Sequence, residues 1–194
     1  MIILTDFDKY MNKFLEFLDS DKESVLITGL DDGAKIQMVL KGLNSKYKNG
    51  MIRCSELGRI AEIINAAFNN KPLPLKISGQ KVYLVGNMEV TFSKYLDSMI
   101  RGTVGEKLDF VLYFPIETVL FPGKEKYLNQ LLHSISNTDS SKIVLMTTND
   151  YKKKLKVLRD IVDEHIHYDI SNDNPNLLKV IKSNLGDFIY PDFS

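Results

Sequence analysis

The sequence predicts an α/β fold in which a mainly parallel sheet is flanked by helices on both faces. Short apolar runs of strand length alternate with longer segments in which apolar residues recur every three or four positions. The strongest strand signal is Phe110–Phe114, which is apolar throughout, as is typical of a strand buried on both faces. Repeated alternation of this kind favours parallel strands joined by covering helices.

The first part of the chain has a clear helical and strand periodicity. An amphipathic segment begins at Phe7, and Thr5 with Asp8 three positions later is typical of a capping box. Gly50 interrupts the pattern before the second strand. We expect strands over 25–28 and 51–54 and helices over 7–18, 36–43 and 57–68, the last ended by Pro72 and Pro74.

Residues 72–100 are compatible with more than one arrangement. The runs 75–77 and 82–85 flank a Ser-Gly-Gln turn, which suggests a hairpin, but the second run is also compatible with a core strand that leads into Gly86 and Asn87. The strand order in this region therefore stays open. A further helix is predicted by the spacing of Phe92, Tyr95, Leu96, Met99 and Ile100.

The second half of the chain continues the alternation. Gly102 and Gly105 open a loop before the strand at Phe110–Phe114. Near the end of the chain, Asn174 and Pro175 are typical of a helix start, and Gly186 of a helix stop. We expect helices over 127–135, 155–162 and 175–185 and strands over 143–146 and 165–170.

Composition excludes few function classes. The 25 basic and 25 acidic residues balance, so no overall field attracts nucleic acid or a membrane surface. Cys54 is the single cysteine, which excludes an internal disulfide and a cysteine cluster for zinc or iron–sulfur chemistry. The amino terminus lacks a signal-peptide pattern, and no run of eighteen apolar residues occurs. We expect a cytoplasmic protein with a single α/β domain over 1–186 and an apolar tail over 187–194.

The segment from Ser24 to Ile36 is the most informative part of the chain, because it has the pattern of a buried strand, a glycine loop and a helix start. Gly29 is followed by four residues and then by Ala34, Lys35 and Ile36. This resembles the Walker A motif G-x-x-x-x-G-K-[ST], whose second glycine and magnesium-binding hydroxyl are replaced here by alanine and isoleucine.

Two further segments follow in the order found in P-loop NTPases. Asp109–Pro115 resembles a Walker B strand, and Lys142–Asn149 resembles a strand that ends in a polar sensor residue. Over about residues 24–149 the chain is therefore similar to the RecA-like and AAA+ branches of that superfamily. The resemblance implies a three-layer P-loop architecture, and it implies that remnants of a nucleotide-binding site are Gly29, Gly33, Lys35 and Asn149.

The groups that hold magnesium in such enzymes are missing from their expected positions. Ile36 replaces the hydroxyl, and the Walker B-like strand ends in Phe114 and Pro115 rather than in a carboxylate. Glu117 and Glu89 are carboxylates in displaced positions. Phosphoryl transfer depends on the metal and on positioned charge, so we expect no catalytic residues, no metal and no cofactor.

The resemblance therefore implies a catalytically inactive domain that acts as an interaction or scaffold subunit, with an active NTPase, in DNA transactions or in defence. Two alternatives stay open. One is a nucleotide-binding protein with weak or non-standard NTPase activity, which would use Lys35, Asn149 and ATP or GTP with magnesium. The other is a small enzyme of unrelated chemistry on a flavodoxin-like sheet.

The loop residues also have an interpretation that needs no ligand. Gly29 and Gly33 would supply positive φ angles to a tight turn. Asp31 and Asp32 lie where phosphates would bind, and they would instead cap the next helix and complement its positive end. Lys35 would be a solvent-facing lysine in the first helical turn, and its replacement by alanine would change the unfolding free energy by at most about 0.5 kcal/mol.

The remaining candidates are weaker. His165 and His167 share one face of a predicted strand, where we interpret them as polar strand residues rather than metal ligands. The basic cluster of residues 152–159 is interpreted as a solvated helix face in preference to a nucleic-acid site. Cys54 is expected to be a packing residue. No membrane contact is expected. We expect a protein partner, because a tail with four large apolar side chains must dock on this domain or on another chain: Phe188, Ile189, Tyr190 and Phe193.

Overall fold

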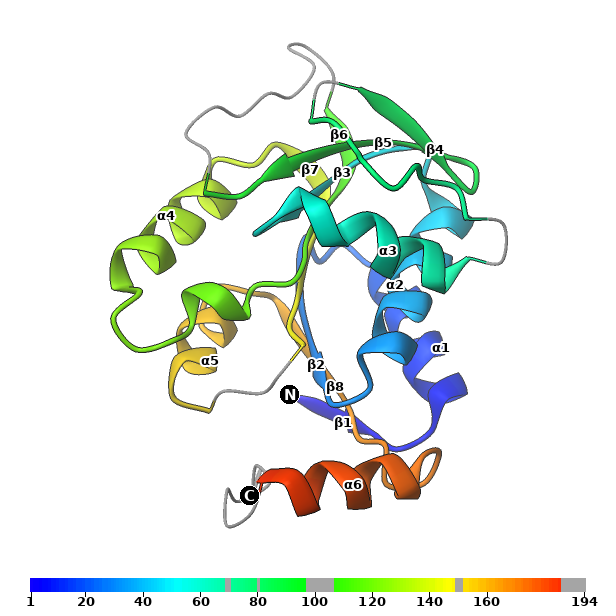
Figure 1. Cartoon of the computed structure of the whole chain (residues 1–194), viewed down its shortest axis with the longest axis vertical. Coiled ribbons are helices and arrows are strands. Elements are labelled where there is room, and N and C mark those ends of the chain that lie inside the picture. The colour runs from blue at the N-terminus through cyan, green and yellow to red at the C-terminus, as the bar shows by residue number, and fades with distance from the viewer. Residues whose placement is uncertain (69–70, 80, 97–106, 149–151, 186–194) are drawn as a thin grey trace.

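An eight-stranded, mostly parallel sheet runs through the centre of the molecule (Figure 1). The computed structural model describes residues 1–68, 71–79, 81–96, 107–148 and 152–185, apart from the side chains of residues 152–154, 182, 184 and 185. The strands are β1 (Ile2–Leu4), β2 (Ser24–Gly29), β3 (Asn49–Cys54), β4 (Val82–Val85), β5 (Met88–Lys94), β6 (Leu108–Tyr113), β7 (Ser140–Met146) and β8 (Glu164–Tyr168). Their order is β1-β8-β2-β7-β6-β3-β5-β4, and the β4–β5 pair is the antiparallel one.

Helices cover both faces of this sheet, which confirms the predicted fold class. One apolar core joins the sheet to the first three helices and to the last, and a second core joins the opposite face to the remaining two (Figure 1). The first group is α1 (Phe7–Asp19), α2 (Asp32–Lys46), α3 (Leu57–Ala67) and α6 (Pro175–Leu185), and the second is α4 (Glu125–Ser136) and α5 (Lys152–Arg159), with the short 3-10 turn η1 (Glu117–Val119).

Most of the predicted elements are confirmed, but the region around residues 75–96 differs from both expected arrangements. The hairpin forms between β4 and β5 around Gly86 and Asn87, so residues 75–77 are not one of its strands. The helix predicted from Phe92 onward is wrong for its described part, since Phe92 lies inside β5. Its side chain is fully buried because alternate residues of β5 face the α2–α3 core.

Three smaller expectations also change. The amino-terminal strand β1 has no counterpart in the sequence prediction, because three residues at a sheet edge are too short to show a period. Helix α1 is capped by Asp6, which accepts bonds from the amides of Asp8 and Lys9, and not by Thr5. Gly50 lies within β3 and does not interrupt it. It packs against Phe110, whose ring leaves no room for a Cβ atom.

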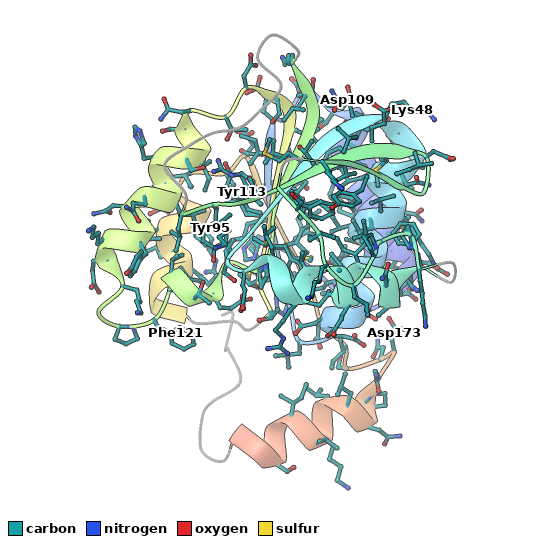
Figure 2. All side chains as sticks on the ribbon, turned by 45° about the horizontal axis from the view of Figure 1, so that its top comes forward. Lys48, Tyr95, Asp109, Tyr113, Phe121 and Asp173 are labelled. Atoms are coloured by element: carbon teal, nitrogen blue, oxygen red, sulfur yellow. The ribbon has the colours of Figure 1, made fainter. Side chains whose placement is uncertain are left out.

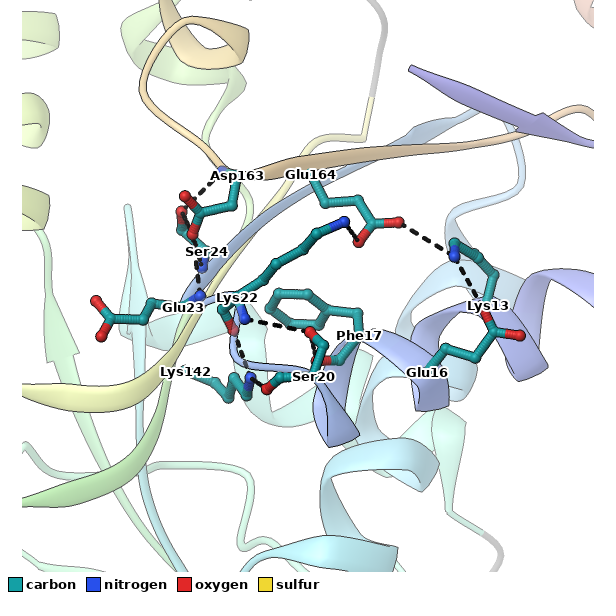
Figure 3. Close-up of polar contacts among 10 residues, drawn as sticks. All are labelled: Lys13, Glu16, Phe17, Ser20, Lys22, Glu23, Ser24, Lys142, Asp163 and Glu164. Atoms are coloured by element: carbon teal, nitrogen blue, oxygen red, sulfur yellow. Dashed lines mark hydrogen bonds and ion pairs between the residues drawn. The ribbon is translucent and has the colours of Figure 1, made fainter.

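A polar cluster fixes the amino-terminal ends of the central strands (Figure 3). The Asp163 carboxylate, just before β8, accepts bonds from the backbone amides of Glu23 and Ser24 and from the Ser24 hydroxyl, all at 2.8–2.9 Å. Burial acts to raise the pKa of Asp163, but these bonds outweigh it and the pKa is lowered. Beside it, the Lys142 ammonium donates to the carbonyl oxygens of Ser20 and Lys22. The candidate site lies at the other end of these strands, where their carboxyl ends meet.

Candidate functional site

The carboxyl ends of β2 and β7 form the topological switch point of the sheet. These strands are neighbours, yet the chain leaves β2 through α2 toward β3 on one side and leaves β7 through α5 toward β8 on the other. In open parallel sheets, ligands bind outside the carboxyl ends of the strands at such a point. The Walker A-like, Walker B-like and sensor-like segments belong to β2, β6 and β7, so they meet at this edge.

The loop that follows β2 is too short to surround a phosphate group. Only Leu30 and Asp31 separate the end of β2 from the start of α2. Gly29 has a φ of 136°, and a Cβ atom there would lie 2.4 Å from the carbonyl oxygen of Tyr168, so glycine is required. Gly33 lies inside the first turn of α2 without a positive φ, and that part of the expectation is wrong.

Asp31 and Asp32 place two carboxylates at the start of α2, where a bound anion would otherwise lie. Asp31 is the N-cap residue, and its carboxylate accepts a bond of 2.9 Å from the amide of Ala34, which confirms the capping prediction. Asp32 lies in the first turn, where its charge complements the positive end of the helix. A capped helix start offers fewer bare amides to a phosphate.

Lys35 is fully buried, and the expectation of a solvent-facing lysine is wrong. Its ammonium donates to the carbonyl oxygen of Gly29 at 2.5 Å and to that of Thr147 at 2.6 Å. It also forms an ion pair of 3.0 Å with Asp32, whose side chain is 47% exposed. The lysine therefore links the last residue of β2 to Thr147, which directly follows β7. Its three donor positions are directed at protein groups.

A pocket of about 270 Å³ lies next to this lysine, between the start of α2 and the end of α3. Its walls are mostly apolar, and Phe114 occupies the place where a Walker B-like strand would present a metal-binding carboxylate. The lining residues are Asp32, Gly33, Ile36, Ile63, Ala66, Ala67, Phe114 and Thr148.

Neither displaced carboxylate lies in this pocket. Glu89 pairs with Asn49 at the amino end of β5, on the opposite edge of the sheet. Glu117 is buried on η1 and belongs to the α4 face. Burial first, with the Glu117 carboxylate adding to it, raises the pKa of the nearby Tyr95 to about 12. The sensor candidate Asn149 and the tail residues lie outside the described part of the chain: Phe188, Ile189, Tyr190 and Phe193.

The two histidines of β8 flank a threonine that the sequence analysis missed. The Thr28 hydroxyl lies 2.8 Å from Nε2 of His165 and 2.8 Å from Nδ1 of His167, and all three side chains are buried. Burial, the Arg159 charge and His167 together lower the pKa of His165 to about 3. Among the described residues no group of three or more metal-ligating side chains occurs. His165 is therefore a buried, neutral side chain at neutral pH.

Arg53 is a second buried cation without a sequence signal. Its guanidinium donates to the Ser134 hydroxyl at 2.5 Å and to the Lys94 carbonyl at 3.3 Å, and lies 5.6 Å from the centroid of the Tyr113 ring. Tyr95 and Tyr113 lie on the same side of the sheet, facing α4 (Figure 2). This network joins α4 to the sheet and is closed to solvent. Cys54, next to it in β3, is buried, as expected of a packing residue.

The basic cluster forms most of α5. Leu155 and Leu158 face the core, and Lys156 is exposed, so the described side chains agree with a solvated helix face.

A scan against protein families and a search of curated protein sequences both return no match for this chain. In the described residues no helix is long and apolar enough to cross a membrane.

Proposed function

We propose that this chain is a degenerate P-loop-type domain that no longer hydrolyses nucleotides and serves as an interaction or scaffold subunit. The observation that carries the proposal is the position of the Lys35 ammonium, which is buried and bound to the carbonyl oxygens of Gly29 and Thr147. A lysine held in this way is withdrawn from the outer phosphates that it would contact in a working Walker A loop.

The surroundings of the lysine support the same conclusion. A working site needs its loop, sensor strand and Walker B strand to converge on one ligand, and β2, β7 and β6 are neighbours with their carboxyl ends at one edge. At that edge, however, Asp31 caps the helix, Ile36 lacks a hydroxyl and Phe114 replaces the metal-binding acid. The layout is compatible with the superfamily, whereas the chemistry that anchors magnesium is missing.

The outer edge of the sheet supports an interaction role. β4 ends the sheet, and its residues Val82 and Leu84 are 56% and 64% exposed on the face opposite to Tyr83. Among the residues that the structure describes, no strand pairs with the outer side of β4, and an edge strand with apolar side chains is a template for pairing with another chain.

The catalytic half of the proposal is tested by measuring phosphate release from ATP and GTP with and without magnesium. We expect no turnover above background. Turnover on the order of 1 per second that is lost in Lys35→Met would overturn the proposal and favour the nucleotide-binding alternative. A loop variant with Asp31→Ser, Asp32→Gly, Ala34→Gly and Ile36→Thr removes the built-in anion but keeps the two-residue connection, so we expect it to gain neither measurable ATP affinity nor hydrolysis.

The interaction half is tested with a matched pair of substitutions. Leu84→Lys places a charge on the β4 edge, and Val180→Lys places one on an apolar position of α6 that is also exposed, at 54%. Partners captured from cells with the unmodified chain should be lost with Leu84→Lys and retained with Val180→Lys, at unchanged melting temperatures. Equal capture by all three proteins would contradict a role for this edge.

A further inference from the structure

β4 is the last strand at one edge of the sheet (Figure 1), and the backbone groups of two of its residues are directed outward. Glu89 of β5 donates its amide to the carbonyl oxygen of Lys48, on the β3 side, so its backbone is turned away from Leu84, the β4 residue opposite to it. Bonded and non-bonded pairs alternate along an antiparallel ladder. The N–H and C=O groups of Val82 and Leu84 therefore point away from β5. In the described part of the chain, no backbone bond outside the β4–β5 ladder involves these two residues.

The side chains of the same two residues form an exposed apolar strip. Val82 and Leu84 are 56% and 64% exposed, and they share one face of β4 because alternate residues of a strand point to the same side. Edge strands are usually protected by a charge, a proline or a bulge, and Val82–Val85 contains neither a charge nor a proline. The edge therefore offers both main-chain bonds and apolar contacts to an added strand.

β4 is complementary to itself in one antiparallel register. With a two-fold axis at Tyr83, Val82 of each copy lies opposite Leu84 of the other. Both residues then exchange backbone bonds, and both exposed side chains gain an apolar neighbour. A register centred on Leu84 would instead place Val82 opposite Gly86, which has no side chain to contact it. Two-fold self-complementarity is the property that an isologous dimer requires.

No like charges lie close together in this register. The β5 residues that flank the apolar strip on the same face are Thr91, beside Val82, and Glu89, beside Leu84. In the joined sheet the two copies of Glu89 are three strand spacings apart, about 14 Å, which is beyond the screening length of about 8 Å at physiological salt. The chain has 25 basic and 25 acidic residues, so two copies do not repel each other through net charge.

We propose that the β4 edge binds a second copy of this chain, by antiparallel pairing of the two β4 strands about a two-fold axis at Tyr83. The inference rests on the interaction role proposed above, and it names the partner. β4 has four residues, and pairing of two such strands buries less than the roughly 1,200 Å² of a standard interface. We therefore expect a weak dimer, with a dissociation constant of about 10–100 µM.

Sedimentation velocity of the purified chain alone is the first test. Between about 2 µM and about 500 µM, on either side of the expected dissociation constant, the chain should change from monomer to mainly dimer. A chain that stays monomeric over this range would overturn the proposal.

A matched pair of substitutions locates the interface. Leu84→Lys should weaken the dimer more than tenfold. Ile3→Lys places the same charge at a 44% exposed position of β1, the strand at the other edge of the sheet, and should leave the dimer unchanged. Val82→Lys is a second β4 variant if circular dichroism shows that Leu84→Lys does not fold. Equal dimerisation of the β4 variant and the Ile3 control would refute the assignment.

Introduced cysteines test the register. Directly opposite bonded residues have Cα atoms about 5.5 Å apart, within the range of about 4.4–6.8 Å that a disulfide needs, whereas diagonal neighbours are about 7–8 Å apart. A mixture of Val82→Cys and Leu84→Cys chains should therefore cross-link at least about fivefold faster with an added oxidant than either variant alone. Cys54 is buried and is common to all samples. Cross-linking of a single variant at the rate of the mixture would contradict an axis at Tyr83.

These results separate the second-copy assignment from the proposed function. If the purified chain is monomeric but Leu84→Lys still loses partners captured from cells, the second-copy assignment fails and the interaction role of the β4 edge remains. If the chain dimerises through β4 and also hydrolyses ATP, the proposed loss of catalysis fails and the dimer remains.

Discussion

Replacing Lys35 by methionine should destabilise the fold, because it removes the charge while keeping most of the side-chain volume. The ammonium donates to two buried carbonyl oxygens, and hydrogen bonds from a charged group contribute about 1.5–3 kcal/mol each. The gross loss is then about 3–6 kcal/mol. Relief of the desolvation cost of a buried charge offsets part of it, and the ion pair with half-exposed Asp32 adds at most about 1 kcal/mol. We expect Lys35→Met to lower the unfolding free energy by about 2–4 kcal/mol.

The measurement is urea unfolding followed by circular dichroism, with Lys41→Met as the control. Lys41 lies on the same helix and is exposed, so its replacement should change the unfolding free energy by less than about 0.5 kcal/mol. Lys35→Ala should cost about 2 kcal/mol more than Lys35→Met, because it also deletes buried methylene groups. If Lys35→Met is as stable as the Lys41 control, the lysine does not join the two strand ends as described.

Substitutions of Gly29, Gly33 and His165 should change the unfolding free energy in ways that test the local structure. Gly29→Ala should lower the unfolding free energy by more than about 2 kcal/mol, because Gly29 has a positive φ and the carbonyl of Tyr168 lies close to it. Gly33→Ala should raise the unfolding free energy by about 0.5–1 kcal/mol, because Gly33 lies in a helix. Equal effects of the two substitutions in urea unfolding would contradict the loop geometry. The pKa of His165 is lowered to about 3 in the folded state, so the unfolded state binds the proton first and stability is lost as the pH falls below about 6.5. Between pH 7 and pH 5 the unmodified chain should lose about 2 kcal/mol more than His165→Gln; parallel pH profiles for the two proteins would refute this.

The elements that the sequence predicted correctly are those whose period is repeated over many residues. The apolar run at Phe110–Phe114 and the periodic helix of residues 7–18 correspond to β6 and α1. β5 was mistaken for a helix start because Phe92 and Tyr95 are three positions apart, the same spacing that a helix gives. Alternation of Met88, Val90 and Phe92 into the core was the competing signal.

The candidate site was predicted in outline but not in its energetics. The pattern of Gly29, Asp31 and Lys35 placed a strand, a turn and a helix start correctly. The burial of Lys35 could not be predicted, because its carbonyl partner at Thr147 is 112 residues away in the chain. The same limit applies to Arg53, whose partner Ser134 is 81 residues away. Sequence periodicity reports which face of an element is apolar, and it carries no information about a polar side chain that finds its acceptors on another element.

The length of the β2–α2 connection explains why the Lys35 ammonium is bound by backbone carbonyl oxygens. With two residues between strand and helix, Lys35 starts in the first turn of α2, directly beside the ends of β2 and β7. An ammonium at that position must either reach solvent or find carbonyl oxygens, and Gly29 and Thr147 supply them. Asp32, in the same turn of α2, forms an ion pair of 3.0 Å with this ammonium. The loop geometry therefore accounts both for the burial of Lys35 and for its ion pair with Asp32.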